Sequence, residues 1–145
     1  MNDRFRRGLG RLAAVMVLGG AVLLLPTTSA VAQTSASSTV SVWIDGWGSG
    51  TVTSRPAGIN CHLATPVGYP YEHAAGEDQS ISGTCHADFP VGTAVTLTAT
   101  PDAGSELNYL DCGGGMASPC TRTVASGYNG VWAMFCPRDG LCSAG

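Results

Sequence analysis

The sequence contains no lysine, so its positive charge comes from seven arginines alone. Four of these arginines lie within residues 1–11. Residues 33–145 therefore combine three arginines with nine carboxylates, a formal charge of 3 − 9 = −6. A surface with this excess of negative charge repels phosphate backbones, which argues against a nucleic-acid partner.

The sequence also lacks an apolar run long enough to anchor it in a membrane. Residues 12–25 are apolar but fall short of the roughly 20 residues that a membrane-spanning helix needs. The run follows an arginine-rich start and precedes the small residues Ala30-Val31-Ala32, an order typical of a secretory signal peptide. We therefore expect residues 1–32 to be a cleaved signal peptide and residues 33–38 a flexible leader. Residues 39–145 are expected to form one secreted or envelope-associated domain with no membrane span.

Convincing helical periodicity is absent from residues 39–145, where apolar residues instead alternate with a period of two. In the first such stretch Val40, Val42 and Ile44 share one face. The glycines of the GSG segment that follows are expected to form the turn of an antiparallel hairpin. The expected strands are residues 39–47, 51–54, 85–89, 93–100, 120–124 and 131–135, the last two forming a second hairpin around Asn129-Gly130. The pattern predicts an all-β fold: a small single-domain antiparallel sheet of about five to six strands, with one long inserted loop at residues 62–84.

Six cysteines in an exported domain of this size predict three disulfides. Fifteen connectivities are possible in principle, and sequence order favours neighbours because each neighbouring pair brackets turn-rich sequence. The favoured pairs are Cys61–Cys85, Cys112–Cys120 and Cys136–Cys142, the last closing a C-terminal hook at residues 136–142. Each closed loop is expected to add about 2–4 kcal/mol of stability to a domain with a small core.

In their order along the chain, these features resemble a divergent internalin-type B-repeat domain, a repeat domain of bacterial secreted and surface proteins. The shared pattern is G-x-G-x-V, then P-x-G-I-x-C, a second cysteine, G-T-x-V-x-L-x-A and a final V-x-A-x-F. The matching residues are Gly48, Gly50 and Val52; Pro56, Gly58, Ile59 and Cys61; Cys85; Gly92, Thr93, Val95, Leu97 and Ala99; and Val131, Ala133 and Phe135. The resemblance implies a small, non-catalytic β-rich domain used in extracellular architecture or adhesion, and it implies no catalytic residues.

Four aromatic residues are the candidate ligand-binding surface. Trp43 and Trp47 alternate onto the strand face opposite the expected core, and Tyr69 and Tyr71 of the inserted loop can extend that surface. Exposed aromatic side chains stack on sugar rings or dock a protein, so the expected partner is a cell-wall glycan or an extracellular protein. The alternative, which we favour, is that the insertion folds over this face and the aromatic residues become a second small core.

Two histidines are weak candidates for a metal site. His62 and His86 each follow a cysteine of the first favoured disulfide. If Cys61 and Cys85 are joined, the two histidines emerge on neighbouring strands and can share a metal ion. The alternative, which we favour, is two surface histidines beside a disulfide whose oxidised sulfurs are not metal ligands. No metal and no cofactor is therefore expected.

Catalytic signatures are missing from the sequence: it has no nucleophile elbow, no HExxH and no cysteine-nucleophile motif. We therefore predict a secreted, non-enzymatic domain for extracellular binding, adhesion or cell-envelope architecture. Two alternatives stay open. One is a secreted protease inhibitor that presents the disulfide-closed loop of residues 112–120, with Met116 as its most prominent side chain. The other is a small secreted hydrolase whose site is assembled by the fold.

Overall fold

The computed structural model describes residues 35–140 and 142. These residues form nine β-strands and no helix, which confirms the predicted all-β class; accordingly, they contain no helix able to span a membrane. The signal peptide predicted at residues 1–32, and the first two residues of the predicted leader, lie outside the described residues. The first strand begins at Ser37, inside the segment predicted to be a flexible leader. Residues 33–145 form one compact unit.

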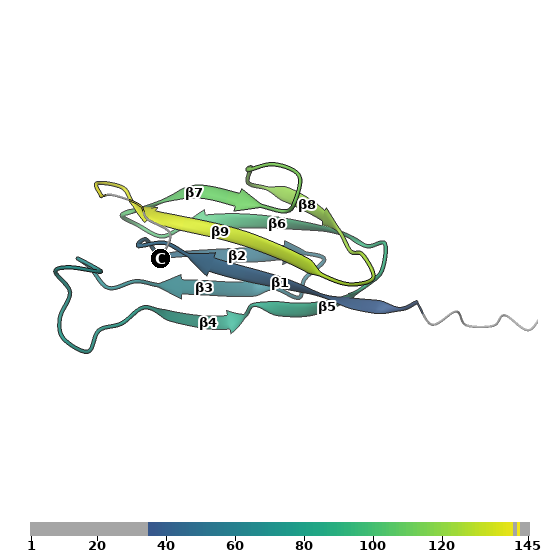
Figure 1. Cartoon of the computed structure of the whole chain (residues 1–145), viewed down its shortest axis with the longest axis horizontal. Helices are drawn as coiled ribbons and strands as arrows, with labels where there is room; N and C mark the ends of the chain where they lie inside the picture. Colours follow the sequence, from purple (N-terminus) through teal and green to yellow (C-terminus); the bar gives the residue numbers. More distant parts are fainter. Residues whose placement is uncertain (1–34, 141, 143–145) are drawn as a thin grey trace, which may run out of the picture. The chain divides into compact units, whose positions relative to one another are not determined.

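The strands divide between two sheets. They are β1 (Ser37–Asp45), β2 (Gly50–Arg55), β3 (Asn60–Ala64), β4 (Ser80–Thr84), β5 (His86–Pro90), β6 (Ala94–Pro101), β7 (Ser105–Asp111), β8 (Cys120–Thr123) and β9 (Asn129–Pro137). A four-stranded sheet has the order β5-β1-β9-β7, and a five-stranded sheet has the order β4-β3-β2-β6-β8 (Figure 1). All neighbouring strands are antiparallel except β1 and β9, which are parallel. The described part of the chain thus has more strands than the five to six expected, in two sheets rather than one.

The expected hairpin of the first two strands is wrong, because β1 and β2 lie in different sheets. The turn after β1 has Gly46 at φ 102°, and Gly48 donates its N–H to the Phe135 carbonyl (2.9 Å) as the chain crosses over. β2 then pairs with β3 and β6. A hairpin and a crossover between packed sheets can both follow an alternating strand with a glycine-rich turn, so the sequence pattern fits either one.

The expected final hairpin is also wrong. β8 lies at an edge of the five-stranded sheet, whereas β9 lies in the interior of the four-stranded sheet, between β1 and β7. Asn129, which suggested a tight turn, is 1% exposed. Its side chain accepts the Ala125 N–H (2.8 Å) and donates to the Gly127 carbonyl (2.9 Å). The buried amide therefore shapes the loop that carries the chain from one sheet to the other.

The predicted inserted loop, residues 62–84, is in part a hairpin, because its two ends belong to the antiparallel strands β3 and β4. The loop between these strands, residues 65–79, is tied to the β1–β2 turn. Thr65 Oγ1 donates to the Gly48 carbonyl (2.7 Å), and Gln79 Nε2 donates to a second carbonyl of the same turn (2.6 Å). Both ends of the loop are therefore held against one turn.

All three favoured disulfides are confirmed. They are Cys61–Cys85, Cys112–Cys120 and Cys136–Cys142. Cys85 lies between β4 and β5, where the chain passes from the five-stranded to the four-stranded sheet. Its carbonyl accepts the Val42 N–H of β1 (2.8 Å). The first disulfide therefore fixes a crossover between the two sheets.

The core is made by the inward faces of both sheets, and the sequence predicted these faces correctly. The buried positions of β1, β6 and β9 include Val40, Val42, Ile44, Val95, Leu97, Ala99, Val131, Ala133 and Phe135. In β1 and β6 the residues between them are not buried, as the period of two requires, whereas in β9 Trp132 is exposed but Gly130, Met134 and Cys136 are also buried. Phe135 is fully buried and packs where Gly50 of β2 has no side chain. The packed core leaves the outer sheet faces and the loops as the surfaces on which a site can be built.

Candidate functional site

The four aromatic residues predicted to form one surface lie in two different places. Trp43 is in β1 and faces outward from the four-stranded sheet. Trp47, Tyr69 and Tyr71 line a hollow formed by loops. The separation has a local cause: β1 ends before Gly46, and the positive φ of this residue turns the chain, so the alternation along the strand does not continue to Trp47.

Trp43 belongs to a group of aromatic side chains on the outer face of the four-stranded sheet, which we call the aromatic patch: Trp43, His86, Tyr128 and Trp132. Trp43 and Trp132 are partners in the parallel register of β1 and β9. The rings of His86 and Trp43 pack edge to face with centroids 6.2 Å apart, and the Tyr128 ring lies 6.0 Å from that of Trp132. Trp43 is 50% exposed, Trp132 41% and Tyr128 65%. Three large aromatic side chains are therefore exposed to solvent on the same face.

The strands themselves aim the aromatic patch outward. On β9, Val131 and Ala133 fill the core, so Trp132 between them must face the other way. Gly130 lies two residues before Trp132 on the same face, and a Cβ there would be 2.5 Å from Tyr128 Cζ. The Tyr128 ring thus lies over a position that has no side chain.

Two carboxylates lie beside the aromatic patch. Asp45 follows Trp43 on the same face of β1, and Asp111 of β7 is the register partner of Trp132. The Oδ1 atom of Asp45 accepts the Gly46 N–H (2.7 Å), and that of Asp111 accepts the Gly113 N–H (2.6 Å). These bonds orient both carboxylates, and each has a second oxygen that can accept a hydrogen bond from a ligand hydroxyl.

The other three predicted residues lie at the loop-end hollow, our name for a cavity of about 560 Å³ where four segments meet. The segments are the β1–β2 turn, the β3–β4 loop, the β6–β7 turn and the residues after β9, all at one end of the two sheets (Figure 1). The rings of Trp47 and Tyr71 lie 5.7 Å apart with an interplanar angle of 82°, and Tyr69 also lines the hollow. Glu72 and Asp139 are its two acidic residues.

The two metal candidates are not brought together. His62 is on the outer face of the five-stranded sheet, where Nε2 lies 2.9 Å from Asp102 Oδ2. His86 is on the outer face of the other sheet, against Trp43. The expectation of neighbouring strands fails because the chain changes sheets at Cys85, between the two histidines. Within residues 35–140 and 142, no group of three or more potential metal ligands is assembled.

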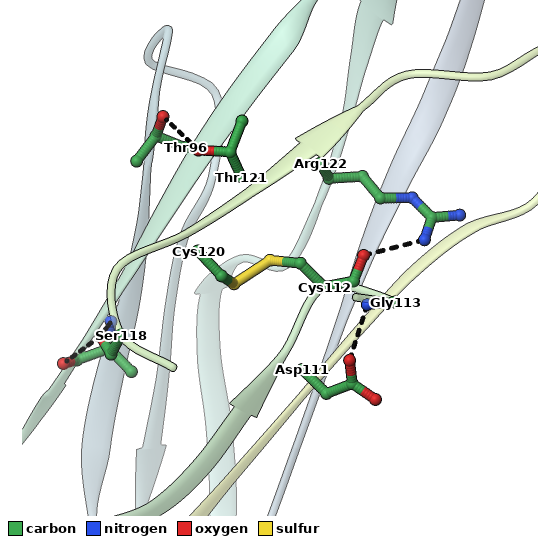
Figure 2. The surroundings of a disulfide bond; sticks show 9 residues. Thr96, Asp111, Cys112, Gly113, Ser118, Cys120, Thr121 and Arg122 are labelled. Atoms are coloured by element: carbon green, nitrogen blue, oxygen red, sulfur yellow. Dashed lines mark hydrogen bonds between the residues drawn. A yellow bond between two sulfur atoms is a disulfide. The ribbon is translucent and has the colours of Figure 1, made fainter. Parts of the chain in front are cut away.

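The loop predicted for a protease inhibitor is closed by the Cys112–Cys120 disulfide and is held from several sides (Figure 2). Arg122 Nη1 donates to the Cys112 carbonyl (2.9 Å), and Ser118 Oγ accepts the Ala99 N–H (3.0 Å). Met116 forms a bridge with Asp111, and its side chain is 74% exposed. The loop therefore presents one apolar side chain from a fixed backbone.

Sequence reasoning missed two members of the aromatic patch, Trp132 and Tyr128. The signal for Trp132 is the alternation of residues 131–135, because a strand that buries Val131 and Ala133 must expose the tryptophan between them. No sequence signal places Trp132 beside Trp43, since that depends on the long-range parallel pairing of β1 and β9. Tyr128 depends in turn on the path of the loop before β9.

Comparison of the chain with protein-family models, with curated proteins and with solved structures gives no match. The resemblance to an internalin-type B-repeat domain therefore stays a prediction.

Proposed function

We propose that this chain is a secreted, non-enzymatic domain that binds a neutral cell-wall polysaccharide through the aromatic patch. The observation that supports the proposal is the pairing of two exposed indoles, Trp43 and Trp132, on adjacent strands of one sheet face. Single exposed apolar side chains are ordinary in folded proteins, but a contiguous group of large aromatic ones marks an interaction site. The three disulfides fit an oxidising, extracellular environment.

The arrangement of the patch favours a sugar chain over other ligands. Neighbouring strands lie about 4.8 Å apart, so Trp43 and Trp132 place two indoles side by side, each able to cover one sugar ring. Asp45 and Asp111 supply hydrogen-bond acceptors at the border of the patch for sugar hydroxyls. The formal charge of −6 on residues 33–145 disfavours an anionic polysaccharide.

The test is a pull-down of residues 33–145 on insoluble cellulose and chitin, with polygalacturonate as the anionic comparison. The test variant is Trp43→Ala/Trp132→Ala. The matched control is Ile81→Ala, which removes an exposed apolar side chain from β4 of the other sheet. We expect the control to bind a neutral polysaccharide like the unaltered protein. We expect the double variant to bind at least tenfold more weakly, because it loses both stacking surfaces.

The two variants replace exposed side chains, so both are expected to fold, which circular dichroism and the urea midpoint will verify. A folded double variant that still binds as tightly as the Ile81→Ala control would show that the patch is not the binding surface. Failure of the unaltered protein to bind either neutral polysaccharide would reject the glycan proposal.

A second candidate function, inhibition of a secreted protease, is favoured by the fixed loop that exposes Met116. Rigid presentation lowers the entropy lost on binding, which is how inhibitory loops achieve affinity. The test is residual hydrolysis by chymotrypsin and subtilisin in the presence of the protein, with Met116→Gly as the test variant and Val67→Gly as the control on a different loop. Inhibition that Met116→Gly abolishes and Val67→Gly preserves would move the assignment to this function. No inhibition by the unaltered protein would reject it.

A further inference from the structure

The loop-end hollow is a second site, separate from the aromatic patch in residues and in shape. None of the four patch residues lines it. The tilt of 82° between Trp47 and Tyr71 makes two walls at a corner, whereas the patch spreads over one sheet face. With Tyr69 as a further aromatic lining residue, the hollow can surround a compact group from several sides.

The walls of the hollow are held by the fold. Thr65, which begins the β3–β4 loop, is bonded to the β1–β2 turn that includes Trp47. The backbone N–H groups of Tyr71 and Glu72 both donate to the Gly68 carbonyl, at 3.0 and 2.7 Å, which closes a tight turn beneath the two side chains. Hydrogen bonds within the fold therefore hold the backbone that presents Trp47, Tyr71 and Glu72.

The charged side chains that line the hollow are both acidic. Glu72 and Asp139 line it, and no arginine or histidine is among its lining residues. The closest arginine in sequence is Arg138, whose guanidinium Nη2 lies 3.4 Å from the carbonyl oxygen of Ser105, itself a lining residue. Its neighbours Pro137 and Asp139 line the hollow, but Arg138 does not. The hollow thus combines aromatic faces with two negative charges.

We propose that the loop-end hollow binds a compact organic cation, specifically a quaternary ammonium group. Aromatic faces attract cations through their quadrupole, and this attraction is strongest for weakly hydrated cations such as alkylated ammonium groups, which lose little solvation on entry. The two carboxylates add Coulomb attraction and exclude anions. The volume of about 560 Å³ accommodates such a group with its attached chain. This site does not depend on the proposed polysaccharide function.

The experiment is a titration of residues 33–145 with choline chloride, replacing sodium chloride so that ionic strength stays constant. The chain has three tryptophans, so a Trp43→Phe/Trp132→Phe background leaves Trp47 as the sole fluorescent indole. We expect saturable quenching of Trp47 with a dissociation constant in the millimolar range. The neutral isostere 3,3-dimethyl-1-butanol has the same shape as choline without its charge, and we expect no saturable response to it.

Variants of the lining residues locate the site. In the same background, Tyr71→Phe keeps the ring and should bind choline like the parent, while Tyr71→Leu should weaken binding about tenfold. Glu72→Gln/Asp139→Asn should also weaken binding several-fold, and Glu106→Gln, an exposed carboxylate outside the hollow, should not. Tyr71, Glu72 and Asp139 are all exposed, so these variants are expected to fold.

Three results would overturn the proposal. Trp47 fluorescence that does not respond to choline would show that the hollow does not bind this cation. Equal responses to choline and to its neutral isostere would show that charge plays no part and that the hollow accepts a neutral group. A Tyr71→Leu variant or a doubly neutralised variant that binds like the parent would place the cation elsewhere. Equal affinities for choline and tetramethylammonium would show that the hollow recognises the ammonium group itself, as proposed.

Discussion

Gly50→Ala tests the packing of the two sheets against each other. Gly50 begins β2 and lies in the interior, where a Cβ would be 2.5 Å from Phe135 Cζ and 2.6 Å from Cδ1. Carbon atoms in contact normally lie about 3.5–4.0 Å apart, so the ring or the backbone must shift by about 1 Å. Forced overpacking costs about 1–3 kcal/mol, and the lower entropy of the unfolded alanine chain returns about 0.5 kcal/mol. We expect a net loss of about 1–2 kcal/mol.

The assay is urea unfolding with the disulfides intact, together with thermal melting. For a domain of this size the loss corresponds to a fall in Tm of about 4–8 °C. Phe135→Leu removes ring atoms at the contact, so the double variant should be at least about 1 kcal/mol more stable than the sum of the two single changes predicts. Gly114→Ala, where a Cβ meets nothing within 4 Å, is the control and should change stability by less than about 0.5 kcal/mol.

Two results would refute this account of the packing. One is a Gly50→Ala variant as stable as Gly114→Ala. This result would mean that Gly50 lies in an open turn, as a β1–β2 hairpin requires. The other is full additivity of Gly50→Ala and Phe135→Leu, because independent costs would mean that the two residues are not in contact.

Three further changes have expected outcomes on the same assays. Cys61→Ala/Cys85→Ala removes a disulfide between cysteines 24 residues apart, at a crossover between the sheets. The loss of this cross-link should lower the free energy of unfolding by about 3 kcal/mol, and an unchanged urea midpoint would contradict this expectation. Asn129→Ala removes a buried amide that accepts the Ala125 N–H and donates to the Gly127 carbonyl, and it should cost about 1–3 kcal/mol; a cost below about 0.5 kcal/mol would show that the loop does not need the amide. Arg122→Met removes the bonds to the Cys112 and Tyr128 carbonyls and should speed protease cleavage within residues 113–119, as read by mass spectrometry; an unchanged cleavage rate would contradict it.

The inward faces of the strands were predictable because the period of two is a local property of the sequence. Strand pairing was not, since it depends on contacts between distant segments. β4 is exposed at all five positions, so it has no hydrophobic alternation to detect. In β7 a register shift between Leu107 and Tyr109 breaks the alternation. The buried Leu110 therefore lies three residues after Leu107, a spacing that does not fit a period of two. Both strands could be located only from their partners.

The candidate site shows the same limit. The disulfide pairs were predictable because neighbouring cysteines bracket turns, and these pairs are present. Some of the exposed aromatic residues could be predicted from the sequence, but which of them lie together in the structure could not. Trp43 and Trp47 have the right spacing for one strand face, and the positive φ of Gly46 between them removes that relation. Trp43 is instead the register partner of Trp132 on the neighbouring strand, 89 residues away in sequence (132 − 43).

The separation of the two aromatic groups means that their proposed ligands can be tested against each other within one domain. The aromatic patch spreads over one sheet face, where an exposed ring can stack on a sugar ring, and the corner of Trp47 and Tyr71 matches a compact cation, because a cation–π site gains from rings on several sides. Tyr71→Leu should therefore lower choline affinity and leave polysaccharide binding unchanged. Trp43→Ala/Trp132→Ala should do the reverse, with choline binding read from the remaining Trp47. A general loss of structure would lower both affinities in either variant, so only the crossed pattern assigns the two ligands to two sites.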